Sequence, residues 1–306
     1  GSGAYTISHT AIGTAYDLVS DPESQTIDFI LSGPAGADDA AAIAKATLIT
    51  NILESRRDCL GFFSPKRSDV IGLTDGDAIV RNMVNYFDQL PSSNYAIFDS
   101  GYKYQFDRFN NKFRYLPLNA DIAGCLCRTV ITDFPWFSPA GARRGVINNA
   151  VKLAFNPTQA QRVLLYVKRI NPVVYSPGAG IVLFGDKTGL SYASAFDRIN
   201  VRMLFLTIEG AIERAARDQL FEFNDSITRS NFVNIVEPYL RDVVAKRGIL
   251  DYRLICDETN NTPDVIDANE FRADIYVKPA RSINFIGLTF VATRTGISFE
   301  EVVGRV

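Results

Sequence analysis

CLGFF, residues 59–63, is a short and almost wholly apolar run that stands between two stretches with helical signals. Runs of the same kind lie on either side of it, TIDFIL at 26–31 and NYAIFD at 94–99. The stretches that separate the three runs, 38–54 and 76–90, read as helices, and the first repeats its apolar residues at helical spacing. Short apolar strands that alternate with helices are typical of a buried parallel sheet. The first third of the chain is therefore predicted to be a doubly wound α/β sandwich layer.

Regular structure is predicted to continue with a hairpin and a helix. YKYQFDRFNNKFRY, residues 102–115, alternates aromatic and polar residues on one side of an Asn-Asn turn, which predicts a β-hairpin with an aromatic face. A helix is expected over 119–132. FPWFSPAGARRG, residues 134–145, then carries two prolines and two glycines. Because such a segment interrupts helices and strands, we place a domain boundary at residue 134.

Long helices and an antiparallel sheet are predicted for the second half, so that the chain is α+β overall. A short helix and a hairpin that turns at Pro177-Gly178 come first. Apolar residues then recur at helical spacing over 196–223, and a further helix is expected over about 228–247, ending at Gly248. Three strands are predicted to close the chain, at 251–257, 270–278 and 282–293.

AGIVLFGDKTG, residues 179–189, comes close to the phosphate-binding loop G-x-x-x-x-G-K-[ST] but has one inserted residue, Asp186. The intervening residues 181–184 suit the inside of a sheet better than a nest of backbone amides. Asp186 would also place negative charge where a phosphate should bind, and no helical pattern begins at Lys187. We therefore interpret FGDKT as a strand end that leads into a polar turn, with nucleotide binding at Lys187 as the weaker alternative.

Chemistry that depends on histidine or on reactive cysteine is disfavoured. His9 is the single histidine and lies near the N-terminus, so a Ser-His-Asp or Cys-His arrangement and a His-based zinc or iron site are not expected. The cysteines lack C-x-x-C spacing and are expected to be reduced core thiols of a protein that folds in the cytosol. They are Cys59, Cys125, Cys127 and Cys256.

The acidic segment CDETNNTPDVID, residues 256–267, gathers four carboxylates that could bind calcium or act as an acid–base pair. Its spacing departs from the D-x-[DN]-x-[DN]-G form of calcium-binding loops. Asn, Thr and Pro between two strands are more typical of a turn in which side chains cap the local backbone. We therefore interpret the segment as a loop and predict no metal and no cofactor.

The overall charge points to no nucleic acid and no anionic membrane. Lys and Arg number 32 against 34 Asp and Glu, so the chain carries no broad cationic field. No apolar run approaches the ~20 residues that cross a bilayer. The basic spots that do occur are predicted to be solvated surface or, as an alternative, a contact with an acidic protein.

Seven segments in the second half, in this order, resemble the tail sheath protein of contractile-tailed bacteriophages of the T-even type. The resemblance is strong over about 128–306 and extends more loosely to the α/β layer before it. The segments are FPWFSPAGARRGVINNAVKLAFNP (134–157), LLYVKRINPV (164–173), FGDKT (184–188), FDRINVRMLF (196–205), LFEFND (220–225), CDETNNTPDVIDANEF (256–271) and KPARSINFIGLTFVATRTG (278–296).

The resemblance implies a fold and a division into domains. It implies an α/β layer, subtilisin-like in layout but without protease activity, over 4–133, and a C-terminal sheath domain over 134–295. Residues 296–306 would be an extended C-terminal arm. Gly-Ser-Gly at 1–3 is expected to be a cloning remnant, in front of a fragment that lacks the N-terminal part of the sheath protein, and a monomer is one expected state of that fragment in solution.

The resemblance also implies a function. Sheath subunits form six-membered rings that stack helically around a tail tube, and the sheath contracts to drive the tube through the host envelope for genome delivery. The implied partners are further copies of the chain, the tail tube protein, the baseplate and the tail terminator. The implied location is the phage tail of the virion, assembled in the cytoplasm of the host bacterium.

Two sets of residues are candidates for contacts in such an assembly. The arm carries Phe299, Val302 and Val303, apolar residues of an unpaired strand that could add to the sheet of another copy. Basic residues near the long helices, Arg241, Lys246 and Arg247, are candidates to face an acidic tube surface. The alternatives are an α/β enzyme, hydrolase or nucleotide-binding, with an unrecognised site, and a monomeric binding module.

Overall fold

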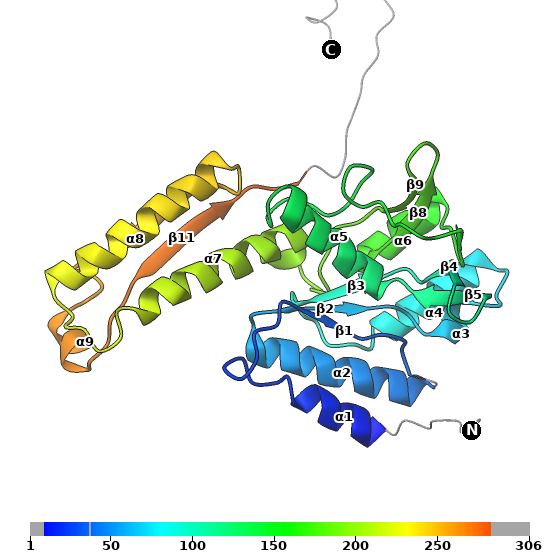
Figure 1. Cartoon of the computed structure of the whole chain (residues 1–306), viewed down its shortest axis with the longest axis horizontal. Helices are drawn as coiled ribbons and strands as arrows, with labels where there is room; N and C mark the ends of the chain where they lie inside the picture. The colour runs from blue at the N-terminus through cyan, green and yellow to red at the C-terminus, as the bar shows by residue number, and fades with distance from the viewer. Residues whose placement is uncertain (1–8, 37, 283–306) are drawn as a thin grey trace, which may run out of the picture.

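The computed structural model describes residues 9–36 and 38–282 and centres on a parallel sheet (Figure 1). Its strands lie in the order β1-β2-β3-β7, and every neighbouring pair is parallel. The central strands are buried along their whole length, as expected for a sheet covered on both faces. The strands are β1 (Phe29–Leu31), β2 (Leu60–Phe63), β3 (Ala96–Asp99) and β7 (Ile170–Asn171). The predicted parallel sheet is confirmed, and β7 joins it from beyond residue 134.

Helices cover both faces of this sheet, with α2 on one face and α5 on the other, and α1 packs on the outside of α2 (Figure 1). α2 begins where the Asp38 carboxylate accepts a hydrogen bond from the Ala41 N–H at 2.8 Å. Gly61 of β2 lets α2 come close, because a Cβ atom there would lie 2.4 Å from Leu53 Cδ1. The helices of this layer are α1 (His9–Asp17), α2 (Asp39–Arg56), α3 (Arg67–Val70), α4 (Gly76–Phe87), α5 (Asn119–Thr132) and α6 (Gln159–Val167).

Two small antiparallel sheets flank the parallel sheet. The predicted hairpin with the aromatic face is confirmed as β4-β5, in which the Tyr104 and Phe113 rings stack 5.2 Å apart, and β6 pairs with the other side of β4. The buried Lys103 ammonium lies 2.8 Å from the Asp121 carboxylate, which ties β4 to α5. The hairpin β8-β9 turns through Gly178, with φ at 86°. The strands are β4 (Tyr102–Asp107), β5 (Lys112–Pro117), β6 (Lys152–Leu153), β8 (Val173–Ser176) and β9 (Gly180–Leu183).

Two long helices and the antiparallel pair β10-β11 form a second lobe (Figure 1). Tyr252 lies opposite Val277 and Leu254 opposite Ile275, and these four residues pack against the apolar cluster of the lobe. The elements are η1 (Ala195–Asp197), α7 (Ile199–Arg217), α8 (Ser226–Ala245), β10 (Ile249–Ile255), α9 (Pro263–Asp267) and β11 (Asp274–Pro279). The alternation predicted for 270–278 is thus confirmed, whereas the strand predicted at 282–293 lies outside the described residues apart from residue 282.

The first long helix is shorter than predicted. We expected it over 196–223, but α7 ends at Arg217 and Phe223 is exposed to solvent. The chain turns here because the Asn224 side chain is drawn to the β10-β11 loop, where its amide donates to Asn261 Oδ1 at 3.0 Å. A tertiary hydrogen bond therefore ends the helix where the spacing of apolar residues predicted that it would continue.

The end of the second long helix also differs from the prediction. Arg247, with φ at 64°, takes the left-handed conformation that was expected of Gly248. Gly248 is needed for its size, because a Cβ atom there would lie 2.9 Å from Trp136 Cδ2. The Trp136 indole N–H donates to the Lys246 carbonyl at 3.0 Å. The close approach of Trp136 thus fixes the end of α8 to the segment that follows α5.

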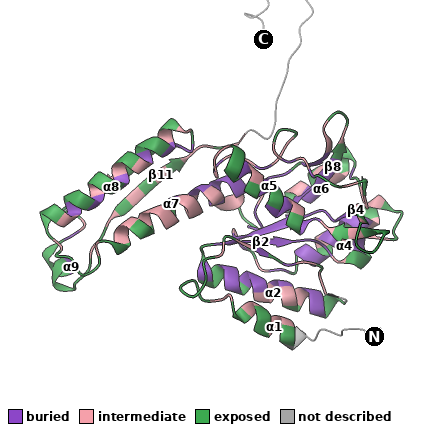
Figure 2. Cartoon of the chain, in the orientation of Figure 1, coloured by how far each residue is buried: buried purple, intermediate pink, exposed green. Residues whose placement is uncertain are grey.

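Most of the buried apolar side chains of the described residues belong to one of two clusters, one in each lobe (Figure 2). The larger runs from Ile30 to Ile199 and draws residues from both sides of residue 134. The smaller contains Trp136 and residues of α7, α8 and β10. The domain boundary at residue 134 stays a prediction. Ile147 and Ile199, which follow this boundary, pack in the same apolar core as the parallel sheet.

A carboxyl group is buried where β3 ends. Asp99 is 1% exposed and accepts hydrogen bonds from Ser64 Oγ at 2.6 Å and from the Gly101 N–H at 2.8 Å. No salt bridge to Asp99 occurs within the described ranges. Burial raises the pKa of Asp99 to about 8, although both hydrogen bonds act to lower it. The folded chain therefore keeps this proton at pH values where the unfolded chain has lost it.

We expect the stability contribution of Asp99 to be full below the unfolded pKa of ~3.9 and to be lost as the pH rises toward the folded pKa of about 8. In the wild type the free energy of unfolding should fall with pH by up to about 1.4 kcal/mol per pH unit between about pH 5 and pH 8. Asp99→Asn should remove this fall, because Asn has no proton to lose. Urea unfolding across that range measures the slope. Equal slopes for the variant and the wild type would contradict this assignment.

Candidate functional site

The segment FGDKT (184–188) follows β9 as the polar turn that was predicted. Asp186 in this turn is only 4% exposed. Its carboxylate accepts hydrogen bonds from Tyr166 Oη at 2.9 Å, Ser138 Oγ at 3.1 Å, Arg198 Nη1 at 2.9 Å and Ser282 Oγ at 2.7 Å. These donors come from α6, from the segment after α5, from the start of α7 and from the segment after β11. We call Asp186 and its four donors the latch, because one carboxylate holds the two lobes together.

The residues next to Asp186 are placed by Asn171, the last residue of β7. The Lys187 N–H donates to Asn171 Oδ1 at 2.7 Å, and the Asn171 amide donates back to the Lys187 carbonyl at 2.8 Å. A Cβ atom at Gly185 would lie 2.8 Å from Asn171 Oδ1. The Lys187 ammonium lies 4.6 Å from the centroid of the Tyr166 ring, and burial together with the Arg198 charge lowers the pKa of Lys187. Protein groups thus occupy the surroundings in which a phosphate would have to bind.

The acidic loop between β10 and β11 is closed by its own side chains. Asp257 Oδ1 accepts from the Thr259 N–H at 2.8 Å, and Asn261 exchanges hydrogen bonds of 2.7 and 2.9 Å with the Arg272 backbone. The turn chemistry predicted for 256–267 is confirmed, with α9 as an unpredicted helical turn. Among the described residues, no group of His, Cys, Asp and Glu is placed to hold a metal ion.

The cysteines offer no activated thiol in the buried positions. Burial raises the pKa of the Cys59 thiol to about 12 and that of the Cys125 thiol to about 11. Neither is a thiolate near neutral pH, which removes them as nucleophiles. Cys256 is also buried and Cys127 is exposed. In the part of the chain that the structure describes, no helix has the length and apolar character to span a membrane.

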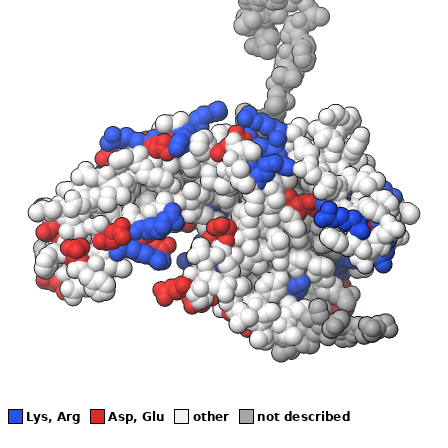
Figure 3. Space-filling model, in the orientation of Figure 1, with Lys and Arg blue, Asp and Glu red and all other residues white. Residues whose placement is uncertain are grey.

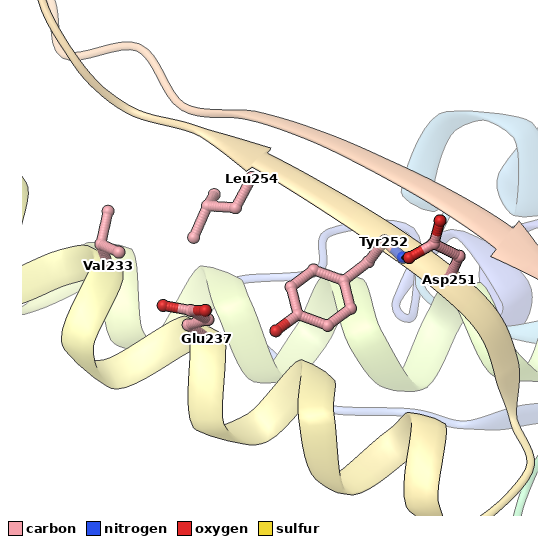
Figure 4. A pocket seen from close by; sticks show the side chains of 5 residues that line it. All are labelled: Val233, Glu237, Asp251, Tyr252 and Leu254. Carbon is pink, nitrogen blue, oxygen red and sulfur yellow. The ribbon is translucent and has the colours of Figure 1, made fainter.

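The β10-β11 pair presents open edges, since no further strand in the described ranges pairs with either one. Tyr252 and Leu254 point from β10 toward α8, while Asp251 points away from it (Figure 4). A groove of about 430 Å³ lies between strand and helix, lined by these residues and by Val233 and Glu237 of α8. An open strand edge is a feature to which an extended segment can add as a further strand.

The basic candidates lie on the last turns of α8 and just beyond, on a surface where Lys and Arg side chains lie among Asp and Glu side chains (Figure 3). Arg241 Nη2 lies 2.9 Å from Glu237 Oε1, and Lys246 Nζ lies 2.6 Å from Asp242 Oδ2. Arg247 forms no ion pair with the described residues and stays exposed. The arm candidates lie outside the described part of the chain: Phe299, Val302 and Val303.

Comparison with known proteins gives matches along nearly the whole chain. Residues 191–293 match the family of phage tail sheath C-terminal domains. The chain is 43% identical over 302 residues to the tail sheath protein of Vibrio phage KVP40 and 45% identical over 300 residues to that of Enterobacteria phage T4. The alignments cover 94% and 95% of this chain but 45% of each relative. The chain therefore spans a little under half of the length of these relatives.

The fold is also that of known sheath proteins. The helical sheath of the anti-feeding prophage in its contracted state aligns with a TM-score of 0.75 over 95% of this chain and 76% of that chain. The identity is only 18%, so this likeness speaks for the arrangement of helices and strands and not for shared side chains. The mixed α/β architecture inferred from the sequence is confirmed.

We expect Asp186→Ala to lower the free energy of unfolding by about 3 kcal/mol or more, because it removes the buried acceptor that Arg198 and three hydroxyl groups share. Asp197→Ala is the matched control, since Asp197 also lies near Arg198, at 3.4 Å, but is more exposed, and a loss below about 1 kcal/mol is expected. Urea unfolding followed by the fluorescence of the single tryptophan, Trp136, measures both. Equal losses for the two variants would contradict a special role of the latch.

Proposed function

Because this chain is a relative of the tail sheath proteins of contractile-tailed phages, we propose that it is part of a structural subunit of such a sheath. In this proposal the subunits polymerise around a tail tube, and the sheath contracts to drive the tube through the host cell envelope. The observation that carries the proposal is the identity of 43–45% along nearly the whole chain. The latch supports it, because a buried carboxylate that ties two lobes together serves a subunit that must transmit force without coming apart.

The proposed subunit is not an enzyme. The alternative of an α/β enzyme, hydrolase or nucleotide-binding, loses support at its main candidate site, because the Lys187 ammonium lies over the Tyr166 ring and the neighbouring Asp186 carboxylate is already hydrogen bonded to protein groups. Contraction then needs no nucleotide. Its free energy would be stored in the lattice at assembly and released when rigid subunits repack into a more stable arrangement.

Copies of the chain are proposed to be joined through the C-terminal arm. The arm residues Phe299, Val302 and Val303 would add as a strand to the β10-β11 pair of a neighbouring copy. The open edges of that pair support this arrangement. Such a tie would keep its backbone hydrogen bonds while other contacts between subunits slide.

From the similarity to tail sheath proteins we also propose further partners. They are the tail tube protein, the baseplate and the tail terminator, within a virion tail that is assembled in the bacterial cytoplasm. Arg241, Lys246 and Arg247 remain the candidates to face an acidic tube surface. Arg247 gives the clearest test of this contact, because it forms no ion pair with a carboxylate of the described residues, whereas Arg241 and Lys246 do.

We expect deletion of residues 297–306 to abolish the formation of ordered tubes by a full-length sheath protein that contains this chain. The deletion removes the strand that would link neighbours and leaves the described core intact. Electron microscopy of negatively stained protein measures tube formation, and a variant with Ser at positions 299, 302 and 303 keeps the length of the arm as a control for its apolar side chains. Tubes of normal order from the deletion variant would reject the arm as the link.

Arg247→Glu is expected to weaken binding of the assembled sheath protein to purified tail tubes by about tenfold at low salt, because it reverses an exposed charge at the proposed contact. The loss should shrink as salt is added, since exposed charges are screened. Co-sedimentation with tubes measures the binding, and Arg108→Glu, on the β4-β5 turn, is the control. Binding that is unchanged by Arg247→Glu would exclude this residue from the contact.

A further inference from the structure

Helix α6 carries an apolar stripe that faces solvent. Ala160, Val163, Leu164 and Val167 recur at spacings of three and four residues, so they lie on one side of the helix. All four are exposed, whereas Leu165 is the buried residue through which α6 packs on the parallel-sheet layer. We call these four residues the α6 stripe. An amphipathic helix normally turns such a stripe toward a core, so an exposed one is a feature of contact surfaces.

The α6 stripe lies in a segment that has cations and no carboxylates. Residues 157–170, PTQAQRVLLYVKRI, contain three cations and neither Asp nor Glu. Lys168 pairs with Asp88 at 2.7 Å, but Arg162 forms no ion pair with the described residues. The Arg162 guanidinium lies 5.3 Å from the centroid of the Phe184 ring, which is also exposed. A partner for this surface should therefore be apolar and acidic.

The turn between α7 and α8 has this chemistry. Residues 218–225, DQLFEFND, contain three carboxylates and no cation. Leu220, Phe221 and Phe223 in this turn are exposed, and the Phe221 side chain is exposed completely. Glu222, between the two phenylalanines, forms no ion pair with the part of the chain that the structure describes. We call residues 218–225 the lobe tip, an apolar and acidic surface that matches the requirement of the α6 stripe.

The backbone of the lobe tip holds Phe221 outward in a disfavoured conformation. Phe221 has φ at 71°, in the left-handed region that disfavours a residue with a Cβ atom. The Leu220 N–H donates to the Arg217 carbonyl and the Glu222 N–H to the Gln219 carbonyl, each at 3.2 Å, so turns fix the loop on both sides. The exposed ring gains no packing within the chain that would offset the strain. A strained residue that presents an aromatic ring to solvent is typical of a binding contact.

The α6 stripe and the lobe tip of one chain lie far apart. α6 belongs to the parallel-sheet layer, whereas the turn from α7 to α8 lies at the free end of the second lobe (Figure 1). They can therefore meet only between two copies. A contact between two different surfaces of identical chains is heterologous, and it repeats from copy to copy into a ring or a helix. Two α6 stripes facing each other would instead oppose like charges.

We propose that the lobe tip of one copy of this chain binds the α6 stripe of a neighbouring copy, with Phe221 as the apolar anchor and Glu222 opposite Arg162. This inference rests on the proposed polymerisation of copies and adds a contact between them that does not involve the C-terminal arm. It gives the exposed apolar stripe a cover and the strained aromatic ring a binding surface.

Disulfide trapping in a full-length sheath protein that contains this chain tests the contact. The variant carries Val167→Cys on the α6 stripe and Phe221→Cys on the lobe tip, with Cys127→Ser to remove the exposed native thiol. Because a heterologous contact links each copy to two others, we expect a ladder of disulfide-linked species beyond the dimer. The control replaces Val167→Cys with Ile131→Cys on α5, where the native side chain is 82% exposed against 71% for Val167. Its ladder should form at least about tenfold more slowly, because thiols held apart cannot join.

Charge exchange tests the pairing of Glu222 with Arg162. Arg162→Glu and Glu222→Arg, each alone, are expected to raise the protein concentration needed for ordered sheath tubes by about tenfold. Both changes in one chain should restore that concentration to within about threefold of the wild type. Glu54→Arg, at an exposed carboxylate of α2, is the control and should not compensate for Arg162→Glu. Unchanged urea unfolding of the same variants of this chain, followed by Trp136 fluorescence, shows that the fold is kept.

Several outcomes would overturn the proposal. Equal ladders from Val167→Cys and Ile131→Cys, or species that stop at the dimer, would reject a specific heterologous contact. Normal sheath tubes from both single charge variants, without a ladder, would reject this contact and keep the sheath proposal. Weaker binding of Phe221→Ser to purified tail tubes, with sheath assembly unchanged, would assign the lobe tip to the tail tube protein instead. Absence of sheath tubes from the unmodified full-length protein would contradict the proposed function itself.

Discussion

The buried carboxylate of Asp186 is the interaction on which the arrangement of this molecule depends. A carboxylate that is removed from water is costly unless its oxygens are hydrogen bonded and its charge is balanced. Four donors from four separate segments meet this requirement, and among them Arg198 supplies the balancing charge. Because those segments belong to α6, to the link after α5, to the start of α7 and to the end of the β10-β11 pair, satisfying one carboxylate also sets how the second lobe joins the parallel sheet.

The second lobe is joined to the rest of the chain at more than one point. Trp136 packs against Gly248 and donates to the Lys246 carbonyl, so the far end of α8 is tied to the segment that precedes the latch. The β10-β11 pair rests one face on the helices of the lobe and keeps open edges. The lobe thus combines fixed contacts within the chain with a strand edge that no other described strand covers.

Much of the fold could be predicted because it depends on local patterns. The short apolar runs and the aromatic alternation of β4 are each readable from neighbouring residues. The prediction failed where distant residues decide. α7 ends at Arg217 because Asn224 bonds to the loop after β10, and Gly248 is small to make room for Trp136, not to adopt a left-handed conformation.

The sequence by itself determined the local features that disfavour a phosphate loop at FGDKT, an inserted acid and a preceding β-rich run, and its order of motifs pointed to the sheath family. Only the tertiary structure decided what Asp186 does, because Ser138, Tyr166, Arg198 and Ser282 lie up to 96 residues away along the chain and no periodicity relates them. The groove beside β10 could not be predicted from the sequence for the same reason. A helix with residues every four positions and a strand with residues every two positions form a common surface only once the chain has folded back on itself.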